Sequence, residues 1–284
     1  MTPRRIAELI EAAAKRLSPS PSRALDAEAL FRGASGMSRA ALLSQGDEPV
    51  YPDVLARFEA AIARRERHEP IQYILGRTAF WRDEFIVSEA VLIPRADTEV
   101  LVEAVAIRLR DLQAPLVLDL GTGSGCIALS LLRELRTARA LAVDLSEGAL
   151  GVAALNAERL GLDARLDLRL SRWFDAVRST ETFDAIVSNP PYVARADEAG
   201  LPREVREFEP ALALFAEPSD DLSSYRAILA GLDPHLKRSG LLAVEVGVGQ
   251  SDRVADLVKT GGLQSIEILN DLAGIPRVVL GRRS

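Results

Sequence analysis

Asparagine, two prolines and a tyrosine stand together in the chain as Asn189-Pro190-Pro191-Tyr192. They follow an apolar run over 183–187 that predicts a buried strand, so they should lie where a sheet opens into a ligand crevice. Two consecutive prolines exclude a helix and remove two backbone donors, which leaves nearby carbonyl groups free to accept hydrogen bonds. The Asn189 side chain adds an acceptor, and the Tyr192 ring adds a flat wall. This combination predicts a pocket for a planar NH2 group, such as an amide or an exocyclic base amine. The alternative is a proline-stiffened loop.

A second chemical signal is the glycine-rich segment Gly121-Thr122-Gly123-Ser124-Gly125, which follows an expected strand and opens an expected helix. Glycine allows unusual backbone angles and the close approach of a ligand. A dinucleotide fingerprint would place its third glycine at position 126, where this chain has Cys126. Asp144 ends the next expected strand, where a carboxylate can accept hydrogen bonds from both hydroxyls of a ribose. Together these features favour S-adenosylmethionine (SAM) over a nicotinamide cofactor.

Two further side chains are candidates for contacts with that cofactor. Asp119 lies just before the glycine-rich segment and can partner the ligand's amino group, directly or through water. It can also cap the backbone amides of the loop, and the two roles are compatible. Trp173 follows the third expected strand and could flank the adenine, although a core or rim aromatic fits the sequence equally well.

Strands and helices alternate after Pro115, which predicts an α/β fold whose mostly parallel sheet has helices on both faces. No helix separates the last two strands, so the final strand should insert antiparallel. The expected strands are 116–120, 140–143, 166–170, 183–187, 241–246, 265–269 and 277–280, and the expected helices are 127–135, 147–160, 222–236 and 251–259.

The first part of the chain predicts helices alone. Apolar residues recur at helical spacing in the first seventeen residues, from Ile6 to Leu17. The charged run Arg64-Arg65-Glu66-Arg67 is interpreted as a solvated face rather than a binding patch. The pattern over 78–91 indicates a hairpin. Further helices are expected over 26–31, 38–43, 52–67 and 100–109.

The composition excludes several classes of protein. A net charge of -6 argues against a general nucleic-acid binder. The only cysteine, Cys126, rules out an internal disulfide framework and a cysteine-rich metal site. His68 and His235 lie far apart and are expected at the surface, without a metal-binding or catalytic role. There is no apolar stretch of membrane-span length and no signal-peptide pattern, so we expect a cytoplasmic protein.

Taken together, these residues closely resemble the HemK/PrmC family, the SAM-dependent glutamine methyltransferases of peptide chain release factors. The likeness covers essentially the whole chain. Asn-Pro-Pro-Tyr alone is shared with enzymes that methylate adenine amines, whereas Ile93-Pro94-Arg95 with Asp97-Thr98-Glu99 and the helical N-terminal part are more specific markers. The remaining matches are Pro70–Gly76, Phe80-Trp81, the glycine-rich segment, Asp144 and Glu207–Pro210.

The resemblance implies a seven-stranded, class I (Rossmann-like) SAM-dependent methyltransferase fold. A helical substrate-recognition domain would cover 1–76, a β-hairpin linker 77–93 and the methyltransferase domain 94–284. The substrate would be the glutamine in the Gly-Gly-Gln motif of class 1 release factors, and the product of the cofactor S-adenosylhomocysteine. The resemblance also implies a monomer that recognises a folded protein substrate. The acidic balance and the lack of a span-length apolar stretch predict no direct nucleic-acid partner and no membrane partner.

Roles for individual residues follow from the resemblance. Asn189, Pro190 and Tyr192 would be catalytic, and with Pro191 they would form the glutamine pocket. With Asp119 added from its position, the expected SAM contacts are Asp119, Gly121, Thr122, Gly123, Ser124, Gly125, Asp144, Trp173 and Asn189.

Three other functions are weighed against this one. A glutamine methyltransferase of a ribosomal protein shares the chemistry and the fold, but Asp97-Thr98-Glu99 favours the release-factor branch. An adenine amino-methyltransferase would need a surface rich in Lys and Arg, against the acidic balance of this chain. A SAM-binding scaffold without catalysis is disfavoured by the intact Asn189 and the unbroken glycine-rich segment.

Overall fold

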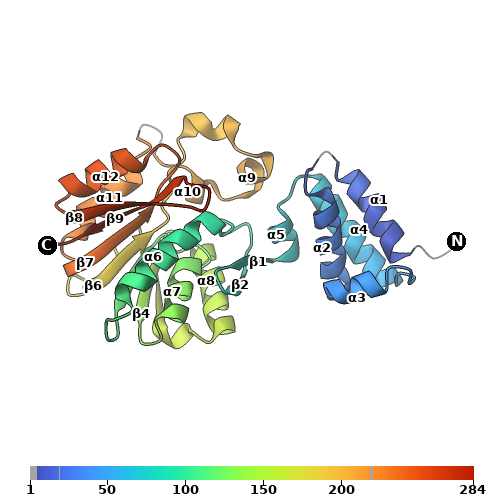
Figure 1. Cartoon of the computed structure of the whole chain (residues 1–284), viewed down its shortest axis with the longest axis horizontal. Helices are drawn as coiled ribbons and strands as arrows, with labels where there is room; N and C mark the ends of the chain where they lie inside the picture. Colours follow the sequence, from blue (N-terminus) through green and yellow to red (C-terminus); the bar gives the residue numbers. More distant parts are fainter. Residues whose placement is uncertain (1–4, 19, 218–219) are drawn as a thin grey trace. The chain divides into compact units, whose positions relative to one another are not determined.

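The computed structural model describes residues 5–18, 20–217 and 220–284 (Figure 1). The backbone divides into two compact units, each described by itself below. The first contains the chain up to Gly76 together with Pro202–Phe208, and the second contains Arg77–Leu201 together with Glu209–Ser284. The sequence places Pro202–Phe208 in the domain over 94–284, whereas in the structure this segment packs with the helical unit. The first four residues of the predicted helical domain lie outside the described residues.

The first unit is built from helices around one apolar core. Ile6, Leu30 and Phe58 are almost fully buried in it. The rings of Phe31 and Phe58 pack edge to face, with 5.3 Å between their centroids. A five-residue helix between Pro70 and Gly76 was not expected, because it is too short to show a helical period. The helices are α1 (Ile6–Arg16), α2 (Arg23–Ser35), α3 (Arg39–Ser44), α4 (Pro52–Glu66), α5 (Ile71–Leu75) and, from the later segment, α9 (Arg203–Phe208).

The charged run at the end of α4 is not simply a solvated face. The side chain of Arg65 is 11% exposed, and its guanidinium bonds to Asp26 on α2 and to Glu204 on α9 at 2.9 and 2.8 Å. The solvated-face interpretation is therefore wrong for Arg65. Helical periodicity could not reveal this, because one of the two acidic partners lies 139 residues away in the chain.

The second unit contains a seven-stranded sheet and confirms the expected α/β fold. Its strands are β3 (Leu116–Leu120), β4 (Arg139–Asp144), β5 (Leu166–Leu170), β6 (Phe183–Ser188), β7 (Leu236–Glu245), β8 (Gln264–Asn270) and β9 (Pro276–Arg282). They lie in the order β5-β4-β3-β6-β7-β9-β8. The first five in this order are parallel, and β9 inserts antiparallel between β7 and β8, as expected.

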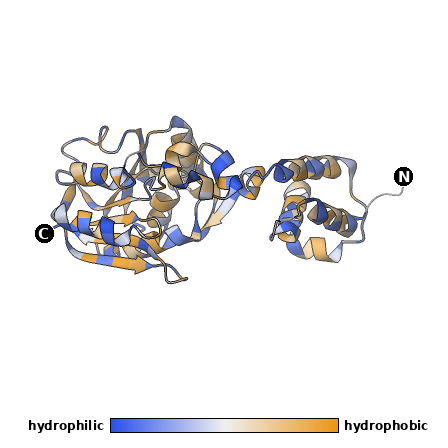
Figure 2. Ribbon diagram, turned by 90° about the horizontal axis from the view of Figure 1, so that it is seen from above, coloured by the Kyte–Doolittle hydropathy of each residue, from blue (hydrophilic) through white to orange (hydrophobic). Residues whose placement is uncertain are grey.

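Side chains alternate between the two faces of a sheet along each strand. Because both faces carry apolar side chains here, helices cover both of them. On β3, Val117 packs in the core formed with α6 (Glu99–Leu109) and α7 (Cys126–Glu134). Leu118 and Leu120 point the other way, into the core formed with α11 (Ser223–Leu232) and α12 (Ser251–Thr260). Figure 2 shows helices that carry both hydrophilic and hydrophobic residues, as expected for helices packed by one face. The remaining elements are α8 (Glu147–Leu160), α10 (Ala211–Leu214) and the 3-10 turns η1 (Ala96–Thr98), η2 (Asp163–Arg165) and η3 (Arg195–Gly200).

The strand order brings two carboxyl ends together. The chain proceeds outward from β3 to β4 and β5, and β6 then returns to the other side of β3. Open α/β sheets bind ligands at such a reversal. The glycine-rich segment follows β3, and Asn189 follows β6, so the sheet places both at this crevice.

The expected hairpin consists of β1 (Arg77–Phe80) and β2 (Asp83–Ile86). Phe80 and Phe85 are buried in the same core as α6 and α7, so the hairpin belongs to the second unit. Its turn contains Trp81 at a φ of 55°, an uncommon angle for an aromatic residue. The Trp81 backbone N–H donates to the Glu99 side chain at 2.7 Å, which holds this turn against the start of α6.

Two local expectations are wrong. The helix predicted over 222–236 ends at Leu232, because Pro234 cannot continue a helix and disfavours it at the preceding residue. His235 is 6% exposed rather than at the surface: its ring stacks on Phe174 at 5.3 Å, and Nδ1 lies 2.9 Å from the Glu181 carbonyl oxygen. Across the described ranges, no helix is long and apolar enough to cross a membrane.

Candidate active site

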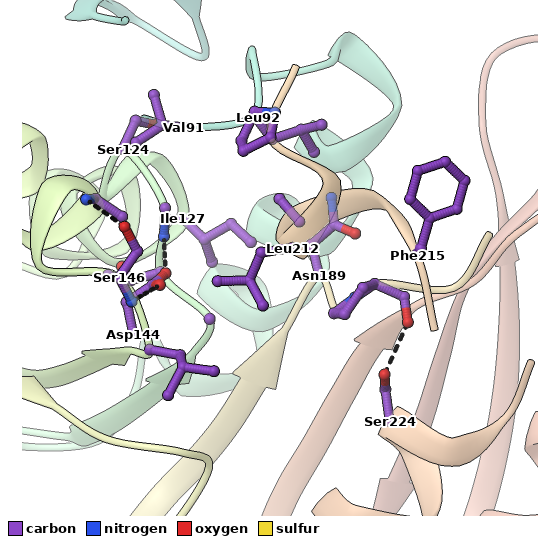
Figure 3. Close-up of a pocket in the computed structure, with 18 of the residues that line it drawn as sticks. Val91, Leu92, Ser124, Ile127, Asp144, Ser146, Asn189, Leu212, Phe215 and Ser224 are labelled. Carbon is purple, nitrogen blue, oxygen red and sulfur yellow. Dashed lines mark hydrogen bonds between the residues drawn. The ribbon is translucent and has the colours of Figure 1, made fainter. Parts of the chain in front are cut away.

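A pocket lies at the carboxyl ends of the central strands and gathers most of the expected site residues (Figure 3). Its wall includes Gly121, Thr122, Gly123, Ser124, Asp144, Trp173, Asn189 and Pro191. Asp119, Gly125, Pro190 and Tyr192 were also expected at the site but do not line this pocket. Their positions and hydrogen bonds show what each of them does instead.

The glycine-rich segment bends sharply because its glycines adopt left-handed angles. Gly121, Gly123 and Gly125 have φ values of 74°, 56° and 80°, which other residues rarely adopt. A Cβ atom on Gly125 would lie 3.1 Å from the Leu129 side chain and 3.2 Å from that of Ala153. Gly125 is therefore a packing position between α7 and α8, whereas Gly121 and Gly123 border the pocket.

Asp144 closes one side of the pocket at the end of β4. Its two carboxylate oxygens accept hydrogen bonds from the backbone N–H groups of Gly123 and Ser146, both at 2.9 Å (Figure 3). Burial raises the pKa of Asp144 above its ordinary value, and these N–H bonds oppose that rise. Each oxygen keeps a further lone pair, so two hydroxyl groups of a ligand could still be accepted.

Asp119 lies under the glycine-rich segment and is completely buried. One carboxyl oxygen accepts from the Thr122 hydroxyl at 2.7 Å, while the other, Oδ1, has no hydrogen-bond partner among the described residues. Such an orphaned buried acceptor is costly unless a ligand or water completes it. An unsatisfied carboxyl oxygen, the glycine bend and Asp144 form a set of acceptors and open backbone that fits SAM, which carries an amino group and a ribose.

Trp173 lines the pocket and also packs against the core shared with α11 and α12, so it is an aromatic residue at the pocket rim. Its φ of 49° is unusual for a non-glycine residue. The Ser171 hydroxyl donates to the Trp173 carbonyl at 3.1 Å and accepts from the Ala176 N–H at 2.9 Å. Ser171 therefore holds the turn that presents the indole.

Asn189 reaches the pocket from the end of β6. Its side-chain Nδ2 donates to the Thr98 hydroxyl at 3.3 Å.

The Pro191 carbonyl accepts from the Ser224 hydroxyl at 2.8 Å (Figure 3), so the expectation of free carbonyls fails at this proline. None of the described residues donates to the Pro190 carbonyl. The Tyr192 hydroxyl donates to Glu245 at 3.3 Å, and Tyr192 does not line the pocket.

Three residues that organise the site were not identified as such from the sequence. Asn156, fully buried on α8, bonds to both backbone groups of Ile86 on β2 and donates to the Ser124 carbonyl, which ties the hairpin to the glycine-rich segment. In the sequence, Thr98 stands out only as part of the segment Asp97-Thr98-Glu99. Glu245 ends β7 next to β6, and an acid at the end of that strand was the available signal.

Two segments that match the family, Ile93–Arg95 and the one containing Glu209, meet although they are far apart in the chain. The buried side chain of Glu209 accepts from the backbone N–H of Ile93 at 3.1 Å and pairs with Arg95. This contact holds the loop that leads into Thr98. Among the described residues, no group of three or more His, Cys, Asp and Glu side chains could hold a metal ion.

The buried Asp119 carboxyl should make stability fall as pH rises. Burial, its largest cause, raises the pKa of Asp119 to about 7, above its value in an unfolded chain, which is about 4. Between these values the folded state binds more protons than the unfolded state, so the free energy of unfolding decreases as pH rises through that window. We expect Asp119→Asn to reduce this decrease, because its amide cannot ionise.

Urea unfolding of the SAM-free protein at pH 5 and pH 8 measures the effect for the wild type and for Asp119→Asn. Some decrease should remain in the variant, because burial also raises the pKa of Glu245 to about 7. The same pH dependence in both proteins would show that the carboxyl ionises normally in the folded state.

Comparisons with known proteins agree with this geometry. Residues 8–76 match a family model described as the PrmC N-terminal domain, and residues 96–204 match one described as the methyltransferase small domain. A release factor glutamine methyltransferase from Cereibacter sphaeroides is 44% identical over 282 residues, covering 98% of both chains. Another protein of that name, from Rhodospirillum rubrum, is 43% identical over 258 residues, covering 91% of this chain and 78% of the relative.

One solved structure is similar in fold alone. The catalytic domain of hMettl16 in complex with an RNA hairpin is 17% identical, with a TM-score of 0.55, and the match covers 69% of this chain and 74% of that one. The likeness shows a shared fold over that part of the chain.

Proposed function

This chain belongs to the release factor glutamine methyltransferase family, and on this premise we propose that it methylates a glutamine side chain of peptide chain release factors. The enzyme is a SAM-dependent protein-glutamine N-methyltransferase. The observation that carries the proposal is the shared pocket: the glycine-rich segment and Asp144 face Asn189 across one cavity at the ends of β3, β4 and β6. A site for a methyl donor and a site for an amide acceptor therefore adjoin.

The cofactor would be held by Asp119, Asp144, Trp173 and the backbone of the glycine-rich segment. SAM supplies, when bound, a methyl group activated by its positively charged sulfur. Asp144 would accept hydrogen bonds from ribose hydroxyls, and the orphaned oxygen of Asp119 would accept from the amino group, directly or through water. Trp173 would flank the adenine.

The acceptor side must position a poor nucleophile, because the lone pair of an amide nitrogen is delocalised into its carbonyl group. The Asn189 side-chain oxygen and the Pro190 carbonyl would accept the two N–H bonds of the glutamine amide and fix its nitrogen toward the methyl group. Positioning of this kind contributes on the order of 7–11 kcal/mol in the most favourable cases. The same two oxygens stabilise the positive charge that develops on the nitrogen.

No general base is required in this scheme, because a protonated N-methyl amide is strongly acidic and loses its proton to water. Neither histidine lines the pocket, in agreement with that chemistry. Tyr192 was expected to pack against the glutamine amide. Since its hydroxyl bonds to Glu245, we propose that it shields the pocket from behind its wall.

The proposal also has finer parts, drawn from the family resemblance. They are the Gly-Gly-Gln motif of class 1 release factors as the acceptor, recognition through the helical unit, a monomeric enzyme and a cytoplasmic location where translation ends. The ribosomal-protein substrate is the nearest alternative.

One labelling experiment tests the substrate. SAM with a labelled methyl group is offered with a release factor, the same release factor with its motif glutamine changed to alanine, a ribosomal protein, and DNA. We expect label in the intact release factor alone. Label in the ribosomal protein or in DNA, with none in the release factor, would overturn the proposal.

A further inference from the structure

Glu245 is a buried carboxylate next to the acceptor side of the pocket. It is 2% exposed at the end of β7. Its Oε2 accepts from the Thr98 hydroxyl at 2.5 Å, and its Oε1 accepts from the Tyr192 hydroxyl at 3.3 Å. The Thr98 hydroxyl in turn accepts from Asn189 Nδ2 at 3.3 Å. We call these three residues the Glu245–Thr98–Asn189 relay.

The relay has a direction that follows from elementary donor and acceptor rules. An ionised carboxylate can only accept hydrogen bonds, so the single hydroxyl hydrogen of Thr98 must point at Glu245. The oxygen of Thr98 is then available only as an acceptor toward Asn189. Of the two ends of the Asn189 amide, only the NH2 end can satisfy it, and the carbonyl end is left to face the pocket.

This direction matters for the reaction proposed above. A glutamine amide nitrogen brings two N–H donors, and it needs acceptors around it. If the Asn189 amide turned over, its NH2 group would face the NH2 group of the substrate, and two donors would oppose each other. An asparagine alone does not decide between these orientations, because its two ends have nearly the same shape.

We propose that Glu245 is a positioning residue that acts through Thr98 to orient the Asn189 amide, with its oxygen toward the glutamine. The inference rests on the proposed function, because it explains how that acceptor is aimed. Glu245 also holds Tyr192 through its second oxygen, and the Tyr225 hydroxyl donates to the Glu245 backbone carbonyl at 3.0 Å, so the end of β7 is held from two sides.

The protonation state of Glu245 sets the direction of the relay. The charged and titratable groups around the carboxyl are Asp97, Cys126, Tyr192, Tyr225 and Arg277. Arg277 is paired with Asp271 and Asp97 rather than with Glu245, so none of the cations among the described residues forms an ion pair with this carboxylate. Burial accordingly raises the pKa of Glu245 to about 7. Once protonated, the carboxyl can donate to Thr98, which frees the hydroxyl hydrogen to bond the Asn189 oxygen and favours the wrong orientation.

Substitutions at Thr98 separate the relay from simple packing. Thr98→Val keeps the shape of the side chain and removes the hydroxyl, whereas Thr98→Ser keeps the hydroxyl and removes a methyl group. We expect Thr98→Val to lower kcat about tenfold, the rate equivalent of one hydrogen bond, with the Kd for SAM unchanged. Thr98→Ser should restore most of kcat. A packing role predicts the reverse, with the serine variant impaired and the valine variant close to the wild type, and that result would overturn the proposal.

The pH profile gives a second measurement. In the wild type, kcat at saturating substrates should fall as pH decreases below about 7, the pKa of Glu245. In Glu245→Gln this acidic limb of the pH profile should be absent, because the amide does not titrate. In Thr98→Val the limb should also disappear, because the link between Glu245 and Asn189 is broken. Retention of the limb in both variants would assign it to another group.

A measurement without substrate keeps the relay testable whatever protein is methylated. The side-chain NH2 resonances of Asn189 are assigned by their loss in Asn189→Asp, and their exchange with solvent is followed by NMR. Exchange should be faster in Thr98→Val than in the wild type or in Thr98→Ser. Equal exchange in all three would disprove the relay. Failure of the wild type to methylate a release factor would instead refute the proposed function alone.

Discussion

Asn189→Ala should lower kcat on the order of 10²–10³-fold and leave the affinity for SAM almost unchanged. The variant removes one of the two acceptors that hold the glutamine nitrogen in line with the methyl group. Losing one preorganised hydrogen-bonding group that stabilises developing charge has a cost of this size in other enzymes. The rate is measured with a saturating release factor and labelled SAM, and the Kd for SAM by calorimetry.

The matched control for this variant is Asn270→Ala, which removes the same side chain from an exposed position on β8. It should retain the wild-type rate. Near-normal turnover of Asn189→Ala would show that Asn189 does not hold the substrate amide. A large loss of SAM affinity would place the residue on the cofactor side instead.

Asp144→Asn should have the opposite pattern: the Kd for SAM rises about tenfold to a hundredfold, while kcat at saturating SAM changes little. Hydrogen bonds to a charged acceptor contribute about 1.5–3 kcal/mol, and the neutral amide keeps only part of that. Asparagine also retains one oxygen that can accept the N–H bond of Gly123 or Ser146, so the loop should survive the change.

Calorimetric titration with SAM measures this effect, and Asp163→Asn, an exposed position on η2, is the matched control. Unchanged affinity in Asp144→Asn would mean that the ribose lies elsewhere in the pocket. The two variants should therefore have complementary effects: Asp144→Asn weakens binding of the cofactor, and Asn189→Ala lowers the rate. A general loosening of the pocket would affect both quantities in both variants.

Much of the second unit could be predicted from sequence because its signals are local. Apolar runs such as 183–187 predicted strands of the sheet, and the missing helix before the last strand predicted that β9 inserts antiparallel. Errors occurred where a local signal was overlooked or too short to read. Pro234 ended α11 early, and the five residues of α5 are too few to show a helical period.

Some features of the candidate site could likewise be predicted from the sequence, and others could not. The glycine-rich segment, Asp144 and Asn189 could be placed together because each follows a strand of a parallel sheet, and the carboxyl ends of such strands meet at one edge. The sequence did not indicate that Gly125 and Tyr192 lie off the pocket wall. That depends on which helix packs behind the loop and on which acceptor a hydroxyl finds.

The sequence by itself therefore determined the class of fold, the family and the residues that could bind a methyl donor and an amide. Only the tertiary structure decided how those residues are aimed. Thr98 meets Glu245 across 147 positions in the chain and Asn189 across 91, and neither contact leaves any periodic trace between its two ends. The physical reason is that a hydrogen bond needs two atoms at a particular distance and direction, and strand order alone brings the ends of β6 and β7 and the turn before α6 to that geometry.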